Sequence, residues 1–301
     1  MLRPSADGLQ AGGLLATCEQ LFKVMEVVMI ARLHLSFFRG IGVIAVSAMM
    51  AASALAATYT WTPTGAGTYN WDNSGGQNNW GTGAGGAYPG TTGDVANMVL
   101  NITGPQTNNL NVAVTNSALY VRDTDNNQKF IIAAGAAGSL TFVGTNGNNA
   151  VLMFGGSGTE GGNCPLITAP VMLNDALSVL NYNGGSRLEI TGKLSSSGTK
   201  NIMLSGGSAG KIILKLDNAA NDFTGDIYAT NIVGSIGYIS DNTAVISCTS
   251  DGSLGNANND IYLNVGQIYA NGYGNITLGA GRKIDVGANG GLIVTAQVGI
   301  A

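Results

Sequence analysis

The clearest spacing of residues that could do chemistry lies in the segment RDTDNN, which begins at Arg122. Asp123, Asp125 and Asn127 alternate as the first ligands of a calcium loop do, and Ca²⁺ prefers such carboxylate and amide oxygens. The segment does not continue as an EF-hand, because Gln128 stands where the glycine belongs. We interpret it as a solvated turn, with a weak Ca²⁺ site as the alternative, and we expect no metal site and no cofactor.

Acid and base groups that could cleave a polysaccharide are the second kind of chemistry to weigh. Enzymes that cleave polysaccharides with carboxylates need two of them close together. In this sequence the carboxylates are dispersed and often lie in Asn/Gly turns, where Asp is a normal turn former. The only histidine, His34, lies close to the N-terminus in a leader-like segment. We therefore name no catalytic residue and expect no enzyme, but a lyase or hydrolase that uses carboxylates stays open.

Three tryptophans, Trp61, Trp71 and Trp80, are the only ones in the chain, and all lie in the Gly-rich segment 57–98. A stack of repeats exposes apolar edges at its ends and needs a cap, a role that suits large aromatic residues with a polar indole nitrogen. Indole faces also stack on sugar rings. We expect a cap, and a glycan-binding module that uses the three tryptophans is the alternative.

Cysteine usage leaves two readings open. Cys18 lies in the segment that we expect to be removed, so Cys164 and Cys248 are the two cysteines of the remaining chain. In an oxidising compartment the two could form a disulfide, and otherwise they are separate buried thiols.

The segment 29–56 reads MIARLHLSFFRGIGVIAVSAMMAASALA, with two arginines, an apolar run and a terminal Ala-Leu-Ala. This order is typical of a secretory signal peptide that is cleaved before Ala57. The apolar run is short for a membrane-spanning helix, which needs about 20 residues, so an uncleaved anchor is the lesser alternative. We expect translation to begin at Met29, or residues 1–28 to be removed with the leader.

Composition and charge restrict the class of protein further. Of 301 residues 46 are glycine and only 10% are charged, while recurrent Ile, Leu and Val runs could bury a core. Removing residues 1–56 leaves nine basic and 14 acidic residues, so the remainder has no basic patch for nucleic acid. Strands joined by turns are favoured over helices.

Short strands are expected between turn signals such as Asn-Gly and Gly-Gly. In residues 211–216 and 261–265 apolar side chains alternate with polar ones, as in half-buried strands. Further expected strands are Leu140–Val143, Val151–Phe154, Val171–Leu173, Leu188–Thr191, Ile202–Leu204, Ile276–Leu278, Ile284–Val286 and Leu292–Val294.

A resemblance to a known family appears in KIILKLDNAANDFTGDIYATN, SDGSLGNANNDIYLNVGQIYANG and ITLGAGRKIDVGANGGLIV. The order resembles the passenger-associated strand repeat of autotransporter-type surface proteins, in which strands alternate with an Asn-aromatic-Thr-Gly turn and a Leu-Gly turn. The corresponding residues are Asn221, Phe223, Thr224 and Gly225 in the first turn, and Leu254 and Gly255 in the second.

The resemblance implies an all-β fold, a right-handed parallel β-helix, with a Trp-rich cap at 57–98 and repeats over 99–301. It also implies a secreted, non-catalytic passenger of adhesin or surface-layer type, outside a Gram-negative-type bacterium. Its partners would be the outer-membrane export machinery and cell-surface or extracellular polysaccharide. No membrane barrel follows the repeats in this sequence, so we expect a passenger truncated at its C-terminus.

Overall fold

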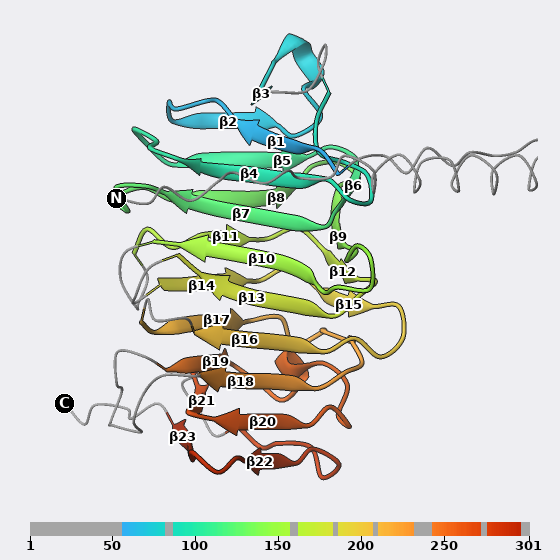
Figure 1. Ribbon diagram of the computed structural model, residues 1–301, viewed down its shortest axis with the longest axis vertical. Coiled ribbons are helices and arrows are strands. Elements are labelled where there is room, and N and C mark those ends of the chain that lie inside the picture. Colours follow the sequence, from blue (N-terminus) through green and yellow to red (C-terminus); the bar gives the residue numbers. More distant parts are fainter. Residues whose placement is uncertain are drawn as a thin grey trace, which may run out of the picture. The chain divides into compact units, whose positions relative to one another are not determined.

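The fold is built from short strands that pair in parallel, as the computed structural model in Figure 1 shows. The structure describes residues 56–81, 87–156, 162–182, 186–206, 210–231, 243–271 and 276–295. Within them the only helical elements are two short 3₁₀ turns, so the expected all-β class is confirmed. The upstream segment 1–28 and residues 29–55 of the expected signal peptide lie outside the described residues.

The largest sheet has ten strands in the order β22-β20-β18-β16-β13-β10-β7-β4-β1-β3. Only β3 runs antiparallel, against β1 at one end of the sheet. The strands are β1 (Thr58–Trp61), β3 (Trp80–Gly81), β4 (Val95–Leu100), β7 (Ala118–Asp123), β10 (Ala150–Gly155), β13 (Leu177–Asn181), β16 (Ile202–Gly206), β18 (Ile227–Asn231), β20 (Ile261–Asn264) and β22 (Ile284–Val286).

Two further parallel sheets contain the strands that alternate with these along the chain. The nine-stranded sheet contains β2 (Gly67–Asn70), β5 (Gln106–Leu110), β8 (Phe130–Ala134), β11 (Leu166–Ile167), β14 (Ser186–Ile190), β17 (Ile212–Leu216), β19 (Ala244–Cys248), β21 (Gly266–Ala270) and β23 (Gly291–Thr295). The four-stranded sheet contains β6 (Ala113–Asn116), β9 (Ser139–Phe142), β12 (Val171–Leu173) and β15 (Leu194–Ser196). The 3₁₀ turns are η1 (Ser74–Gly76) and η3 (Gly252–Leu254).

We call one passage of the chain through these sheets a layer. Each strand pairs with the strand in the same position of the next layer, so side chains of one kind form columns. Ile202, Ile227 and Ile261 are in register, and all three are completely buried. Each such side chain contributes about 1.5–3 kcal/mol when buried. This stacking is consistent with a β-solenoid.

The expected inward face of β17 is confirmed, because Ile212, Leu214 and Leu216 are buried. On the opposite face Lys215 is partly exposed, but Ile213 is buried as well. One expected strand is wrong, because Ile276–Leu278 lies outside every strand, although two of its side chains pack against the core. The apolar side chains of this segment pack on the core although its backbone does not pair with a strand.

Layer length varies, which explains why the sequence has no strict period. Register pairs are separated by 37 residues between Thr58 and Val95, by 23 between Val95 and Ala118, and by 33 between Ala118 and Val151. The boundary expected between residues 98 and 99 falls inside β4. The Trp-rich segment therefore supplies the first strands of the same sheets.

Candidate functional site

The turn Asn221–Gly225 stacks beside β15, the last strand of the small sheet. The backbone N–H of Asp222 donates to the carbonyl of Leu194 at 3.0 Å. Phe223 is completely buried. Gly225 has a φ of +137°, and a Cβ there would lie 2.2 Å from the carbonyl oxygen of Lys200. Only glycine fits this position without displacing the preceding layer.

The side chain of Asn221 joins three layers. Its Oδ1 accepts the backbone N–H of Leu194 at 2.8 Å, and its Nδ2 donates to the carbonyl of Ser253 at 2.8 Å. Both bonds are buried. The amide side chain of Asn221 therefore supplies hydrogen bonds to two buried backbone groups, the N–H of Leu194 and the carbonyl of Ser253.

Asn259 connects the two turns of the motif. Its Nδ2 donates to the carbonyls of Phe223 and Leu254 at 2.9 and 3.1 Å. Its Oδ1 accepts the N–H of Gly225 at 3.0 Å. Leu254 is completely buried, and Gly255 follows it with a φ of +76°. Asn259 could not be identified from the sequence, because its role depends on a turn 36 residues earlier.

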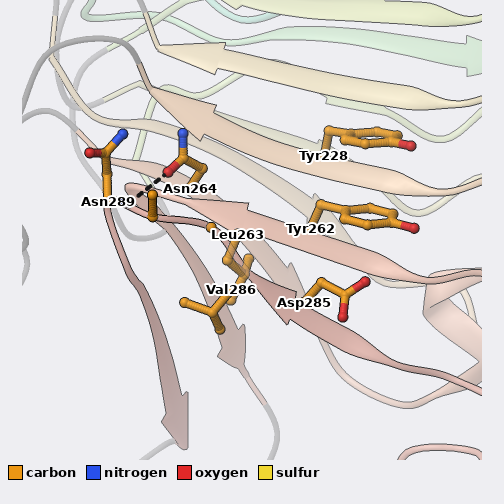
Figure 2. Close-up of a pocket in the computed structure, with 9 residues that line it drawn as sticks. Tyr228, Tyr262, Leu263, Asn264, Asp285, Val286 and Asn289 are labelled. Carbon is orange, nitrogen blue, oxygen red and sulfur yellow. Dashed lines mark hydrogen bonds between the residues drawn. The ribbon is translucent and has the colours of Figure 1, made fainter.

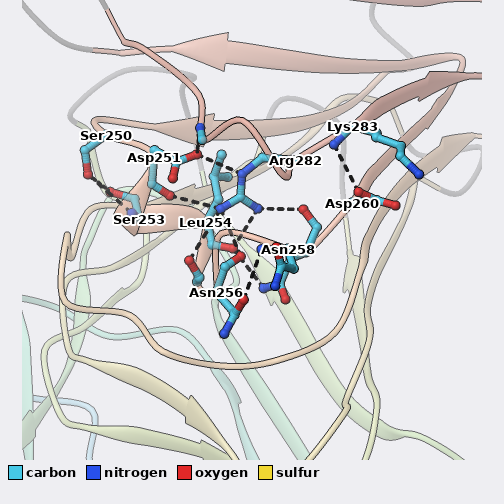
Figure 3. A network of polar contacts seen from close by, with 12 residues as sticks. Ser250, Asp251, Ser253, Leu254, Asn256, Asn258, Asp260, Arg282 and Lys283 are labelled. Carbon is cyan, nitrogen blue, oxygen red and sulfur yellow. Dashed lines mark hydrogen bonds and ion pairs between the residues drawn. The ribbon is translucent and has the colours of Figure 1, made fainter.

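Arg282 completes this network with a buried guanidinium group (Figure 3). Its Nε donates to Asp251 Oδ1 at 2.8 Å, and its Nη1 donates to the carbonyl of Asn259 at 2.8 Å. Its Nη2 donates to the carbonyl of Asn256 at 3.1 Å. Burial would raise the pKa of Asp251, but bonds from Arg282 and from the N–H of Gly279 outweigh it and lower the pKa. The network joins successive layers.

The three tryptophans form one buried cluster near β3. Trp80 lies 4.8 Å from both Trp61 and Trp71, measured between ring centroids, with edge-to-face geometry. Trp61 Nε1 donates to Gln106 Oε1 at 2.9 Å, and Trp71 Nε1 donates to the carbonyl of Pro89 at 2.7 Å. Each tryptophan is at most 1% exposed. No indole face is open to a sugar ring, which argues against a glycan platform made of these residues.

Asp123 closes a turn. Its Oδ2 accepts the N–H groups of Asn127 and Gln128 at 2.9 and 2.7 Å, and its Oδ1 accepts the N–H of Ile102 at 3.1 Å. Burial raises the pKa of Asp123, although these donors oppose the shift. Asp125 accepts a bond from the Asn127 amide at 2.8 Å. Within the described residues no group of three or more His, Cys, Asp or Glu could hold a metal ion.

Carboxylates on the outer faces are engaged by the next layer or by cations. Asp226 Oδ1 accepts the N–H of Asp260 at 2.9 Å, and Asp260 Oδ1 accepts that of Lys283 at 3.0 Å. Lys215 Nζ lies 2.8 Å from Glu189 and 3.0 Å from a neighbouring aspartate carboxylate. These contacts give each of these four carboxylates a structural partner.

Cys164 and Cys248 form no disulfide. Cys248 is in register with Leu216, which pairs with Ile190 in the layer before. Ile190 pairs with Ile167, in the layer that contains Cys164. Three layers of about 4.8 Å separate the thiols, whereas a disulfide needs Cα atoms within about 7 Å. The reading of separate buried thiols is correct.

A cavity of about 340 Å³ opens beside β18, β20 and β22 (Figure 2). Tyr228, Tyr262 and Asp285 lie on one side of it, and Asn264 and Asn289 lie on the other. None of these residues was expected to form a site. A signal was present in the sequence, because Asp-Ile-Tyr occurs twice, at residues 226–228 and 260–262.

Most of these polar contacts hold layers together, whereas the cavity is lined by polar and aromatic side chains beside the large sheet. No helix among the described residues is long and apolar enough to cross a membrane. Comparisons of the chain with protein-family models, curated proteins and solved structures found no match. The function therefore has to be inferred from the geometry.

Proposed function

We propose that the chain is a right-handed parallel β-helix that acts as a secreted, non-catalytic passenger of an autotransporter-like surface protein. The observation that carries the proposal is the in-register column of Ile202, Ile227, Ile261 and Ile284, which continues through successive layers. Such stacking needs no ligand and presents extended outer faces. Adhesion to cell-surface or extracellular polysaccharide, or a place in a surface layer, uses such faces.

The Trp-rich segment serves as the N-terminal cap in this proposal. The antiparallel pairing of β3 with β1 places a short strand at this end of the large sheet. Trp61, Trp71 and Trp80 fill the interior next to it. Because β3 is only two residues long, it offers little backbone for pairing with another chain, which limits edge-to-edge aggregation of an exported protein.

A non-catalytic role is supported by the way the carboxylates are used. Asp226 and Asp260 stand on adjacent layers, as a polysaccharide lyase or hydrolase would require, but one oxygen of each accepts a backbone N–H of the next layer. Incubation of the purified chain with acidic and neutral polysaccharides, with and without Ca²⁺, tests this point. Release of cleaved product would overturn the non-catalytic assignment.

Export is tested by expressing the full chain in a Gram-negative host and sequencing the N-terminus of the recovered protein. We expect protein in the periplasm or medium that begins near Ala57. A variant without residues 41–56 should stay in the cytoplasm. Wild-type protein that stays in the cytoplasm with its leader intact would contradict the proposal.

A further inference from the structure

Two columns of outward side chains run along the large sheet, because its strands from β1 to β20 are paired in register (Figure 1). We call the two columns together the outer strip. One column contains Thr58, Val95, Ala118, Val151, Ser178, Met203, Tyr228 and Tyr262, and the other contains Thr60, Asn97, Tyr120, Met153, Leu180, Ser205, Thr230 and Asn264. No residue of the outer strip is charged.

The middle of the outer strip is apolar. Val151, Met153, Leu180 and Met203 come from the neighbouring strands β10, β13 and β16, and each of these side chains is partly exposed. The outward cation Arg122 on β7 lies beside the strip, where its guanidinium group is held 5.8 Å from the centroid of a tyrosine ring. Contiguous exposed apolar surface of this kind marks sites where proteins associate.

The outer face of the nine-stranded sheet has a different character. Its strands β14 and β17 present Arg187, Glu189 and Lys215, which form ion pairs with one another. Covering that face would remove charges from water, which is costly, whereas covering the outer strip removes none. The outer strip also offers no counter-charge to a charged partner such as an acidic polysaccharide.

The size of the outer strip suits a partner with an equally flat face. Strands about 4.8 Å apart and about five residues long give eight of them a face of about 38 by 16 Å, or about 600 Å². Two such faces together bury about 1,200 Å², which is the lower end of the range for stable and specific interfaces. Sheets packed face to face interdigitate their side chains at a separation of about 10 Å. A second copy of the chain brings the same uncharged columns, and symmetric pairs are the commonest protein assemblies.

We propose that two copies of the chain associate through the outer strip, sheet face against sheet face, as a two-fold symmetric dimer. The inference goes beyond the proposed passenger role and does not depend on it. Because the buried area lies at the lower end of the range, the dimer should dissociate on dilution.

Sedimentation velocity of the purified, folded chain over about a hundredfold range of concentration tests the proposal. We expect the mass to rise from that of a monomer to that of a dimer. Leu180→Lys places like charges in the middle of the contact and should keep the chain monomeric at every concentration. Ile131→Lys is the matched control, because Ile131 is a partly exposed, outward residue of β8 in the other sheet, and it should associate as the wild type does. Circular dichroism checks that both variants are folded.

Cross-linking locates the contact independently of any loss of association. Ser178 lies on β13, near the middle of the outer strip, so Ser178→Cys in a Cys18→Ala background should give a covalent dimer with a bismaleimide. Cys164 and Cys248 are buried and should not react. Thr107→Cys, outward on β5 of the other sheet, should give no such dimer.

A monomeric wild type at every concentration would overturn the proposal, and so would association of Leu180→Lys equal to that of the wild type. Cross-linking through Thr107→Cys but not through Ser178→Cys would place the contact on the wrong sheet and overturn it as well. Failure of export with the dimer retained would remove only the passenger role, whereas export of a monomer would remove only the dimer.

Discussion

Asn221 donates its side-chain N–H to the main-chain carbonyl of Ser253, one layer away, at 2.8 Å. The same amide accepts the N–H of Leu194 at 2.8 Å, so removing it leaves two buried backbone groups without these partners. We expect Asn221→Ala to lower the free energy of unfolding by about 2 kcal/mol, measured by urea denaturation. Asn258→Ala removes an exposed asparagine near the same turn and should change it by less than about 0.5 kcal/mol. Equal effects of the two variants would contradict a bridging role for Asn221.

Gly225 and Gly198 form a second matched pair. Both have positive φ, but a Cβ at Gly225 would lie 2.2 Å from the carbonyl oxygen of Lys200, whereas one at Gly198 would meet nothing within 4 Å. Gly225→Ala should destabilise the protein by about 3 kcal/mol or more, because it adds a clash to backbone strain. Gly198→Ala should cost only about 1 kcal/mol. Thermal unfolding followed by circular dichroism measures both, and a smaller loss for Gly225→Ala would show that the layers can separate without cost.

Asp251 should make stability depend on pH in the acid range. Its pKa in the folded state lies below the ordinary value of 3.8, so its contribution is present above that value and is lost as the pH falls below it. Denaturation between pH 7 and pH 2 should show this decline, and Asp251→Asn should flatten part of it.

At pH 7 Asp251→Asn also leaves the Arg282 side chain buried without its counter-ion, because that side chain is 0% exposed. The expected loss is about 3 kcal/mol. Asp222→Asn is the control, since the Asp222–Lys193 pair is largely exposed and should contribute no more than about 1 kcal/mol. If the two variants lose the same stability, the buried network has no special role.

Cys248 should be unreactive while the protein is folded. Burial raises the pKa of its thiol to about 11, so roughly one molecule in a thousand carries the thiolate at pH 8. In a Cys18→Ala/Cys164→Ala variant, which leaves Cys248 as the only thiol, we expect slow reaction with Ellman's reagent that becomes complete in urea. Rapid reaction of the native protein would show that β19 opens readily.

The sequence was sufficient for properties that depend on neighbouring residues. Strand Val171–Leu173 was expected with its observed bounds, and the inward face formed by Ile212, Leu214 and Leu216 was recognised. Both could be predicted because a two-residue period is visible within a few consecutive residues. The segment Ile276–Leu278 looks the same locally but forms no strand. Local pattern does not reveal whether a neighbouring layer offers partners for hydrogen bonds.

The tertiary structure alone decided which residues meet across layers. Tyr262 stacks on Tyr228 at a separation of 34 residues, whereas Tyr228 follows Met203 by 25, since turns of variable length separate the strands. Arg282 reads as a surface charge in its own segment, yet it is buried among carbonyls from a turn 23 to 31 residues earlier. The chain by itself determined that strands would form and which side chains they would bury. The stacking of layers determined the register, and with it the cavity and the buried network, because those contacts exist only between distant turns.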